Sequence, residues 1–263
     1  MPQGSKSRSK RWWRVPPSGL PKVRLDQLLA DRGLAQDLKE AQALVMAGLV
    51  FSGDTRLEKP GQAMDPDSAL SVRSKEHPFV GRGGVKLEAA LSHWGIQVEG
   101  LQCLDMGAST GGFTDCLLRR GAAKVYAVDS GTNQLDWRLR NDPRVSCMEQ
   151  QNVLDLELSQ LGGELDFACI DLSLTSLENV FPVLLKVLKQ GARWVALIKP
   201  QYQVGPEDRV HGVVKNDDDF YRQLCDRIAE VAELTGLGPL GVISSPIKGR
   251  EGNAEFLISG QKI

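Results

Sequence analysis

Two features of the sequence have residue types and a spacing that suit nucleoside binding. They are the turn Gly-Ala-Ser-Thr-Gly-Gly at 107–112 and the carboxylate of Asp129. Free N–H groups at the start of a helix can face the polar end of a ligand, and glycines let the backbone approach it closely. A carboxylate at the end of the next strand can accept hydrogen bonds from both hydroxyls of an unmodified ribose. The turn lacks the G-x-G-x-x-G spacing of dinucleotide folds, which favours S-adenosylmethionine over NAD. A glycine-rich turn that only connects two core elements is the alternative.

The elements around this turn predict the opening unit of a doubly wound parallel sheet. The apolar run LQCLDM precedes the turn, a helix with Phe113, Cys116, Leu117 and Leu118 on its apolar side follows it, and KVYAVD ends at Asp129. Apolar runs predict strands near 101–106, 124–129, 144–148, 165–170, 193–199, 239–244 and 254–259, with a long helix over about 218–234. The last two strands suit an antiparallel closing hairpin.

Four motifs in this order, GRGGVKL, DMGASTGGFTDCLLRRGA, IKPQ and GNAEF, resemble the TlyA family from Lys22 to the C-terminus. Members of that family carry an S4-type RNA-binding domain before an FtsJ/RrmJ-like methyltransferase domain. The resemblance implies an α/β class I Rossmann-like fold with a seven-stranded, mostly parallel sheet and a small N-terminal α+β domain. It also implies an S-adenosylmethionine-dependent 2'-O-ribose methyltransferase acting on ribosomal RNA, with cytidine as the expected nucleotide.

The resemblance places a catalytic Lys-Asp-Lys-Glu set at Lys86, Asp171, Lys199 and Glu255. Transfer of a methyl group to a ribose hydroxyl requires that oxygen to be held in line with the methyl carbon and to lose its proton. We expect Lys199 to act as the activating base. Asp171 and Lys86 would orient the hydroxyl and tune that lysine, and Glu255 would hold Lys86 or the ribose.

The cofactor-binding residues follow from the resemblance together with the local chemistry. The expected set is Gly107, Ser109, Thr110, Gly111, Gly112, Phe113, Asp129, Asn152 and Asp171. Asn152 is placed to contact the adenine amino group, although an asparagine there can equally cap a turn. Asp171 is expected to touch the methionine end of the cofactor.

The chain is expected to divide into a basic tail (1–21), an S4-like RNA-binding domain (22–73), a linker (74–80) and the methyltransferase domain (81–263). The S4-like domain should have a helix with Leu25, Leu28 and Leu29 on one face, then a helix whose buried face includes Met46. Leu38 and Gln42 stand where the family often has arginine. The remaining candidates for RNA phosphate contacts are Lys22, Arg24, Arg32 and Lys39. The tail, with Trp12, Trp13 and five cations, is either an RNA-binding arm or a solubilising segment.

Bulk properties narrow the function classes. The formal net charge of −1 means that RNA must be held by local basic patches. Five cysteines form no CxxC pair, so no metal site or disulfide framework is expected, and the longest apolar runs contain lysine or arginine, so no membrane span is expected. A cytoplasmic protein is expected, with ribosomal RNA or ribosomal subunits as partners and a monomer as the favoured state.

A long loop at 201–215 is expected over the site and contains His211, which could act as a base but more readily contacts RNA or solvent. Three other functions stay open from the sequence. One is an RNA-binding ribosome-assembly factor with a catalytically inactive methyltransferase fold. The other two are a membrane-active hemolysin, which would need an amphipathic or spanning segment, and a small-molecule methyltransferase.

Overall fold

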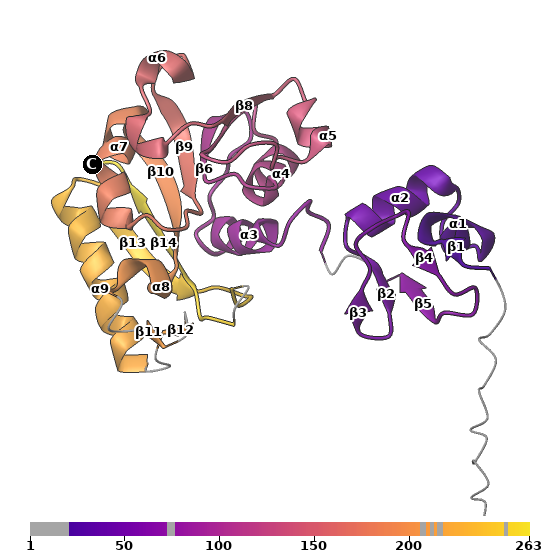
Figure 1. The fold of residues 1–263 in the computed structure, drawn as a ribbon. Helices are drawn as coiled ribbons and strands as arrows, with labels where there is room; N and C mark the ends of the chain where they lie inside the picture. The colour runs from indigo at the N-terminus through magenta and orange to yellow at the C-terminus, as the bar shows by residue number, and fades with distance from the viewer. Residues whose placement is uncertain (1–20, 73–76, 206–208, 211–212, 215–217, 250–251) are drawn as a thin grey trace, which may run out of the picture. The chain divides into compact units, whose positions relative to one another are not determined.

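A computed structural model describes residues 21–72, 77–205, 209–210, 213–214, 218–249 and 252–263. The chain divides into two compact units, Met1–Glu76 and His77–Ile263. Each unit has its own hydrophobic core. Figure 1 shows the helices and strands of both units. His77 opens the second unit, so residues 77–80 of the expected linker lie within it.

In residues 21–72, the described part of the first unit, there are two helices and five short strands. The elements are β1 (Val23–Arg24), α1 (Leu25–Asp31), α2 (Leu38–Met46), β2 (Val50–Ser52), β3 (Thr55–Arg56), β4 (Ala63–Met64) and β5 (Leu70–Val72). Strand β1 pairs with β4, and β2 lies between β3 and β5. Leu25, Leu29 and Val45 are buried in its core, as the helical spacing predicts. Met46 was predicted on the buried face but is 78% exposed, because it is the last residue of α2 and follows Val45 onto the outer side.

The second unit is built on a seven-stranded sheet in the order β13-β14-β10-β9-β6-β7-β8. The strands are β6 (Gln102–Met106), β7 (Lys124–Asp129), β8 (Val145–Glu149), β9 (Leu165–Ile170), β10 (Leu188–Ile198), β13 (Pro239–Ser244) and β14 (Phe256–Gln261). Strand β14 is antiparallel to both of its neighbours, and the other pairings from β10 to β8 are parallel. The predicted mostly parallel sheet with a closing antiparallel hairpin is therefore confirmed.

Alternating side chains on the strands feed two cores, one on each face of the sheet. One core contains Phe167, Cys169 and the apolar side of α4 (Gly112–Arg119) with α3 (Gly83–His93). The other contains Ala168 and Ile170 with α7 (Leu177–Val187) and α9 (Asp218–Leu234) (Figure 1). Short elements complete the unit: α5 (Trp137–Arg140), η1 (Val153–Asp155), α6 (Leu158–Leu161), α8 (Pro200–Gln203), β11 (Arg209–Val210) and β12 (Val213–Val214).

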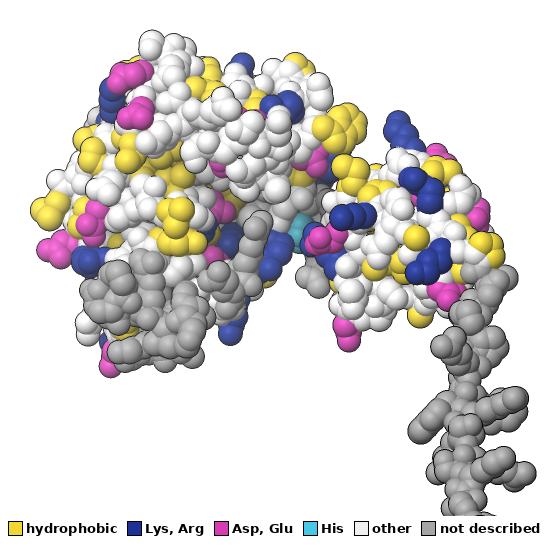
Figure 2. Space-filling view, in the orientation of Figure 1, with side chains coloured by type: hydrophobic (Ala, Val, Ile, Leu, Met, Phe, Trp, Pro, Cys, Tyr) yellow, Lys and Arg dark blue, Asp and Glu magenta, His cyan; other side chains and the backbone are white. Residues whose placement is uncertain are grey.

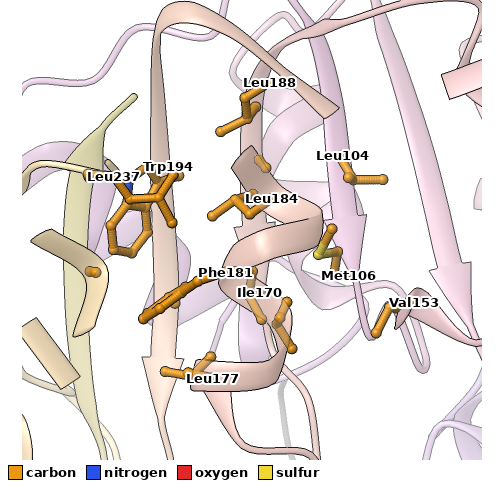
Figure 3. Close-up of a cluster of buried hydrophobic side chains, with 14 of the residues drawn as sticks. Leu104, Met106, Val153, Ile170, Leu177, Phe181, Leu184, Leu188, Trp194 and Leu237 are labelled. Carbon is orange, nitrogen blue, oxygen red and sulfur yellow. Dashed lines mark hydrogen bonds between the residues drawn. The ribbon is translucent and has the colours of Figure 1, made fainter. Parts of the chain in front are cut away.

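The second core is centred on Trp194 of β10. Its ring lies 5.6 Å from that of Phe181 on α7, and Leu184 packs beside them (Figure 3). The indole nitrogen is buried and donates to the carbonyl of Leu237 at 2.8 Å, which satisfies its polar group. This packing fixes β10, and with it the residue that follows the strand.

Two boundaries differ from the sequence prediction. Strand β10 begins at Leu188 because Leu188 pairs with Leu165 before an irregularity that ends at Arg193. The final strand begins at Phe256, so Glu255 lies just before it. The expected loop at 201–215 begins with the short helix α8, and His211 lies outside the described residues.

Candidate active site

The loops after β6, β7, β8 and β9 meet at the carboxyl edge of the sheet. Among the described residues, the non-glycine residues with positive φ are Ser109, Asn133, Gln150 and Leu174, one in each of these loops. Such conformations cost free energy, and they persist where the surrounding structure holds them, often at functional sites. The concentration of backbone strain at this edge marks it as the candidate site.

The glycine-rich turn after β6 is held against β7 and β9. The amides of Gly107 and Ala108 both donate to the carbonyl of Val128, at 2.8 and 3.1 Å. Gly107 has a φ of 90°, and a Cβ atom there would lie 2.5 Å from the backbone oxygen of Asp171. Residue 107 must therefore be glycine because its backbone conformation and the loop that carries Asp171 both exclude a side chain.

The other two glycines of the turn serve packing within the protein. Gly111 has a φ of 96°, and a side chain there would overlap Leu139. A Cβ atom on Gly112 would lie 2.9 Å from the amide nitrogen of Gly84. Glycine at both positions lets α5 and the start of α3 pack on the turn, and the expected approach of these glycines to a ligand stays a prediction. Phe113 is 2% exposed and packs in the adjacent core, so its contact with a cofactor stays a prediction.

Asp129 ends β7 with its carboxylate turned back toward the glycine-rich turn. One oxygen accepts the amide of Ser109 at 2.8 Å, and the other accepts the amide of Gly131 at 2.7 Å. Each carboxylate oxygen has a second acceptor site, so Asp129 can still accept hydrogen bonds from ribose hydroxyls. Its orientation is fixed in advance by the backbone.

Glu149, at the end of β8, is a residue that the sequence interpretation missed. Its carboxylate accepts the amides of Asn133, Gln134 and Leu135. The guanidinium of Arg140 and these amides lower the pKa of Glu149 to about 2. It holds the loop after β7 as an ionised anchor, and its place at the end of a parallel strand, like that of Asp129, was the available signal.

Asn152 is exposed at the start of η1, and its side-chain oxygen accepts the amide of Leu154 at 3.1 Å. The turn-capping alternative therefore describes what its oxygen does. Its amide nitrogen stays available as a donor, so contact with a cofactor remains a prediction.

Lys86 and Glu255 form a buried ion pair between α3 and the residue before β14. Their side chains are 9% and 3% exposed. Helix α3 begins at Gly83, inside the GRGGVKL motif, and a Cβ atom on Gly83 would lie 3.6 Å from a carboxylate oxygen of Asp171. The start of α3 thus brings Lys86 and the Asp171 loop to one place.

Lys199 and Asp171 form a second ion pair, with Nζ 2.7 Å from Oδ1. The ammonium also donates to Ser173 Oγ at 3.0 Å and lies 6.0 Å from the centre of the Tyr202 ring. Their side chains are only 12% and 21% exposed. Since β14, β10 and β9 are adjacent in the sheet, the strand register brings Glu255, Lys199 and Asp171 to the same edge. Helix α3 adds Lys86, so the expected catalytic set forms two lysine–carboxylate pairs there.

Asp105 is a second residue that the sequence interpretation missed. It is fully buried in β6, one oxygen accepts the Thr114 hydroxyl at 2.6 Å, and Oδ1 has no hydrogen-bond partner. Burial raises the pKa of Asp105 to about 7, and the charges of Asp171 and Asp129 add to this effect. Its signal in the sequence was an acidic residue inside an apolar strand.

The four predicted RNA contacts of the first unit are all exposed. Two of them hold the fold: Arg24 forms an ion pair with buried Asp26 at 2.7 Å, and Arg32 donates to the backbone oxygens of Ser68 and Pro66. Gln42, where the family often has arginine, donates to the Asp26 carboxylate at 3.0 Å. On the face shown in Figure 2, cations of this unit are interspersed with carboxylates and apolar side chains.

The described part of the chain bears on metal binding and on membrane spans. Within those ranges, no group of three or more His, Cys, Asp or Glu side chains could hold a metal ion. None of the helices in the same ranges is long and apolar enough to cross a membrane. The basic tail lies outside the described residues.

Comparison with known proteins gives consistent matches. The model of the FtsJ-like methyltransferase family matches residues 79–262. A Mycobacterium tuberculosis protein named 16S/23S rRNA (cytidine-2'-O)-methyltransferase TlyA is 40% identical over 90% of this chain and 89% of its own length. Hemolysin A of Brachyspira hyodysenteriae is 37% identical over 89% and 98%. A solved structure of a Streptococcus thermophilus protein named as a hemolysin is 41% identical, with a TM-score of 0.71 over 92% of this chain and 89% of that one.

Proposed function

Since this chain belongs to the TlyA family of FtsJ-like methyltransferases, we propose that it transfers a methyl group from S-adenosylmethionine to a cytidine 2'-oxygen of ribosomal RNA. The observation that carries the proposal is the pairing of Lys199 with Asp171 beside the cofactor turn. A vestigial fold has no need of this arrangement, since two ion pairs with little solvent exposure are costly to maintain. An inactive assembly factor is therefore disfavoured.

The residues at the carboxyl edge fit the cofactor. Asp129 keeps acceptor capacity for the ribose hydroxyls, and the turn at 107–112 presents backbone groups at the start of α4. The unpaired oxygen of Asp105 is a buried acceptor next to this turn, which suits a cationic ligand. When bound, S-adenosylmethionine supplies an electrophilic methyl group.

The neutral amine form of Lys199 is proposed to receive the proton of the ribose hydroxyl as that oxygen takes up the methyl group. Asp171 and Ser173 hold its Nζ at 2.7 and 3.0 Å, so the nitrogen has a fixed position at the edge. The carboxylate of Asp171 also stabilises the positive charge that develops on Nζ when it binds the proton. The Lys86–Glu255 pair closes the other side of the site and contributes a second cation near the reacting oxygen.

The first unit is proposed to hold the RNA, with exposed Lys22 and Lys39 as phosphate contacts. Arg24 and Arg32 keep part of their guanidinium groups exposed while they hold the fold. The proposal implies that the enzyme works in the cytoplasm, where ribosomal RNA is assembled. A ribose inside folded RNA can reach the edge only if its nucleotide is turned out of the stack.

The test is transfer of labelled methyl from S-adenosylmethionine to purified ribosomal subunits and to their free RNAs. Lys199→Ala should abolish transfer. Lys189→Ala is the matched control, because Lys189 pairs with Asp166 at 2.6 Å across the same two strands at the opposite edge of the sheet. We expect the label at a ribose 2'-oxygen with wild type and Lys189→Ala. Cofactor and RNA binding without any methyl transfer by wild type would refute the proposal.

The same assay separates the remaining enzyme class. Free cytidine, supplied in place of RNA at millimolar concentration, should receive little label because it offers nothing for the first unit to hold. Efficient methylation of a small molecule, with ribosomal RNA left unlabelled, would identify a small-molecule methyltransferase instead.

A further inference from the structure

The loops that carry Asp171 and Lys199 are joined at two points. The first is the contact of Lys199 with Asp171 and Ser173 near the sheet. The second lies farther along both loops, where the side-chain oxygen of Gln203 accepts the Leu177 amide at 3.0 Å and the Ser176 hydroxyl at 3.3 Å. Gln203 therefore closes a ring of contacts whose other end is the Lys199–Asp171 pair.

Gln203 is itself firmly held. Gln203 is buried, with 8% of its surface exposed. It is the last residue of the one-turn helix α8, which starts directly after Lys199. Its backbone oxygen accepts Arg227 Nη2 of α9 at 2.6 Å, and Arg227 lies 3.6 Å from Glu178 of α7. The segment after Lys199 is thus tied to α7 and α9 through one residue.

The loop between the two contact points contains a residue with an unfavourable backbone conformation. Leu174, midway between Asp171 and Leu177, has a φ of 68° and is 86% exposed, so its own side chain makes little packing that would hold it there. A leucine in this conformation is unfavourable because its Cβ atom crowds the following carbonyl oxygen. The contacts at both ends of the loop must therefore hold its conformation. The same contacts keep Ser173 within hydrogen-bond distance of Lys199 Nζ.

We propose that Gln203 is a positioning residue for the Lys199–Asp171 pair, which it aligns by fixing the loop 171–176 to the segment after Lys199. This inference rests on the proposed methyl transfer. Gln203 would act through Lys199 and would not touch the substrate. Because a displacement of about 1 Å from reacting geometry can cost on the order of 100-fold in rate, loosening this brace should lower the rate constant of chemistry.

The test compares two substitutions of similar size. Gln203→Leu removes the acceptor, whereas Gln203→Glu keeps an oxygen that accepts the same two hydrogen bonds at the start of α7, where a negative charge is favourable. Gln261→Leu is the matched control, because Gln261 donates to Gly191 at the opposite edge of the sheet. Each is assayed for kcat, KM, cofactor binding and thermal unfolding on the full chain.

We expect Gln203→Leu to lower kcat about 10- to 100-fold, with cofactor and RNA dissociation constants within about 2-fold of wild type. Gln203→Glu should recover kcat to within about 3-fold, and Gln261→Leu should match wild type. A Gln203→Leu protein with wild-type kcat, or one that Gln203→Glu fails to improve, would overturn the positioning role while wild-type activity still stands. Absence of activity in wild type would instead overturn the proposed function itself.

Discussion

The buried Lys86–Glu255 pair allows stability and catalysis to be separated in one experiment. Glu255→Gln keeps the size of the side chain but leaves the Lys86 ammonium without its counter-charge. With the two side chains 9% and 3% exposed, solvent screening is weak, and the loss of one partner of such a pair costs about 3–5 kcal/mol. For a unit of this size that corresponds to a fall in Tm of roughly 6–20 °C.

The double variant Lys86→Met, Glu255→Gln removes both charges. Apolar or neutral replacement of a buried pair is often neutral for stability, so the double variant should regain stability to within about 1 kcal/mol of wild type. Methyl transfer should stay at least about 100-fold below wild type, because the second cation at the edge is gone. Urea unfolding of the cofactor-free protein gives the free energies, and the labelled-methyl assay gives the rates.

Three outcomes would refute this reasoning. A Glu255→Gln protein that loses less than about 1 kcal/mol would show that the pair is solvated in solution and does not behave as a buried pair. A double variant that is stable and fully active would show that these charges take no part in the reaction. A double variant as unstable as the single one would point to packing, not charge, as the source of the loss.

Three further outcomes are expected. Asp105→Asn should stabilise the protein by up to about 4 kcal/mol above pH 7 and by little at pH 4. Burial raises the pKa of Asp105 to about 7, so as the pH rises from 4 to 7 the unfolded chain loses this proton before the folded protein does, and wild-type stability falls. A difference in urea midpoints between the two proteins that does not change with pH would contradict this prediction. Gly107→Ala should abolish cofactor binding, as measured by calorimetry, and lower Tm, because the new Cβ atom would meet the backbone of Asp171. Gly100 also has a positive φ, but no atom lies within 4 Å of a Cβ atom there, so Gly100→Ala should keep cofactor binding. Equal effects of the two substitutions would assign the loss to backbone strain alone. Asp26→Asn should lower the free energy of unfolding at pH 7 by about 1–2 kcal/mol, a value discounted for the exposure of Arg24. Because Arg24 lowers the pKa of Asp26 to about 2, the difference between the two proteins should vanish as the pH falls from about 4 to 2. Unfolding curves at pH 7 and pH 3 measure this decrease.

The strand pattern and the glycine-rich turn were predictable because they depend on local sequence. Apolar runs predicted β6, β7, β9 and β13, and the helix Asp218–Leu234 has the predicted bounds. Met46 and the start of β10 were placed wrongly, since the last residue of a helix and an irregular strand pairing depend on neighbours that periodicity does not reveal.

Within the site, the sequence pointed to residue types and to the edge where they meet, through motifs that resemble a known family. It did not show that Gly112 is small because Gly84 packs on it, or that Gln42 supports buried Asp26. Glu149 and Asp105 were missed because an acidic residue at or inside a strand carries no local sign of what it will accept. Their roles come from backbone amides and a hydroxyl contributed by distant segments.

The sequence by itself determined the class of fold, the family and the set of groups available for chemistry, because strand alternation, turn glycines and motif spelling are written along the chain. Only the tertiary structure decided which lysine pairs with which carboxylate, and that one pair is buried and the other partly exposed. It also decided that Gln203 accepts a hydrogen bond at the end of the loop that carries Asp171. These pairings join residues as far apart as Lys86 and Glu255. They follow from the order and register of strands in the sheet, which local patterns do not specify.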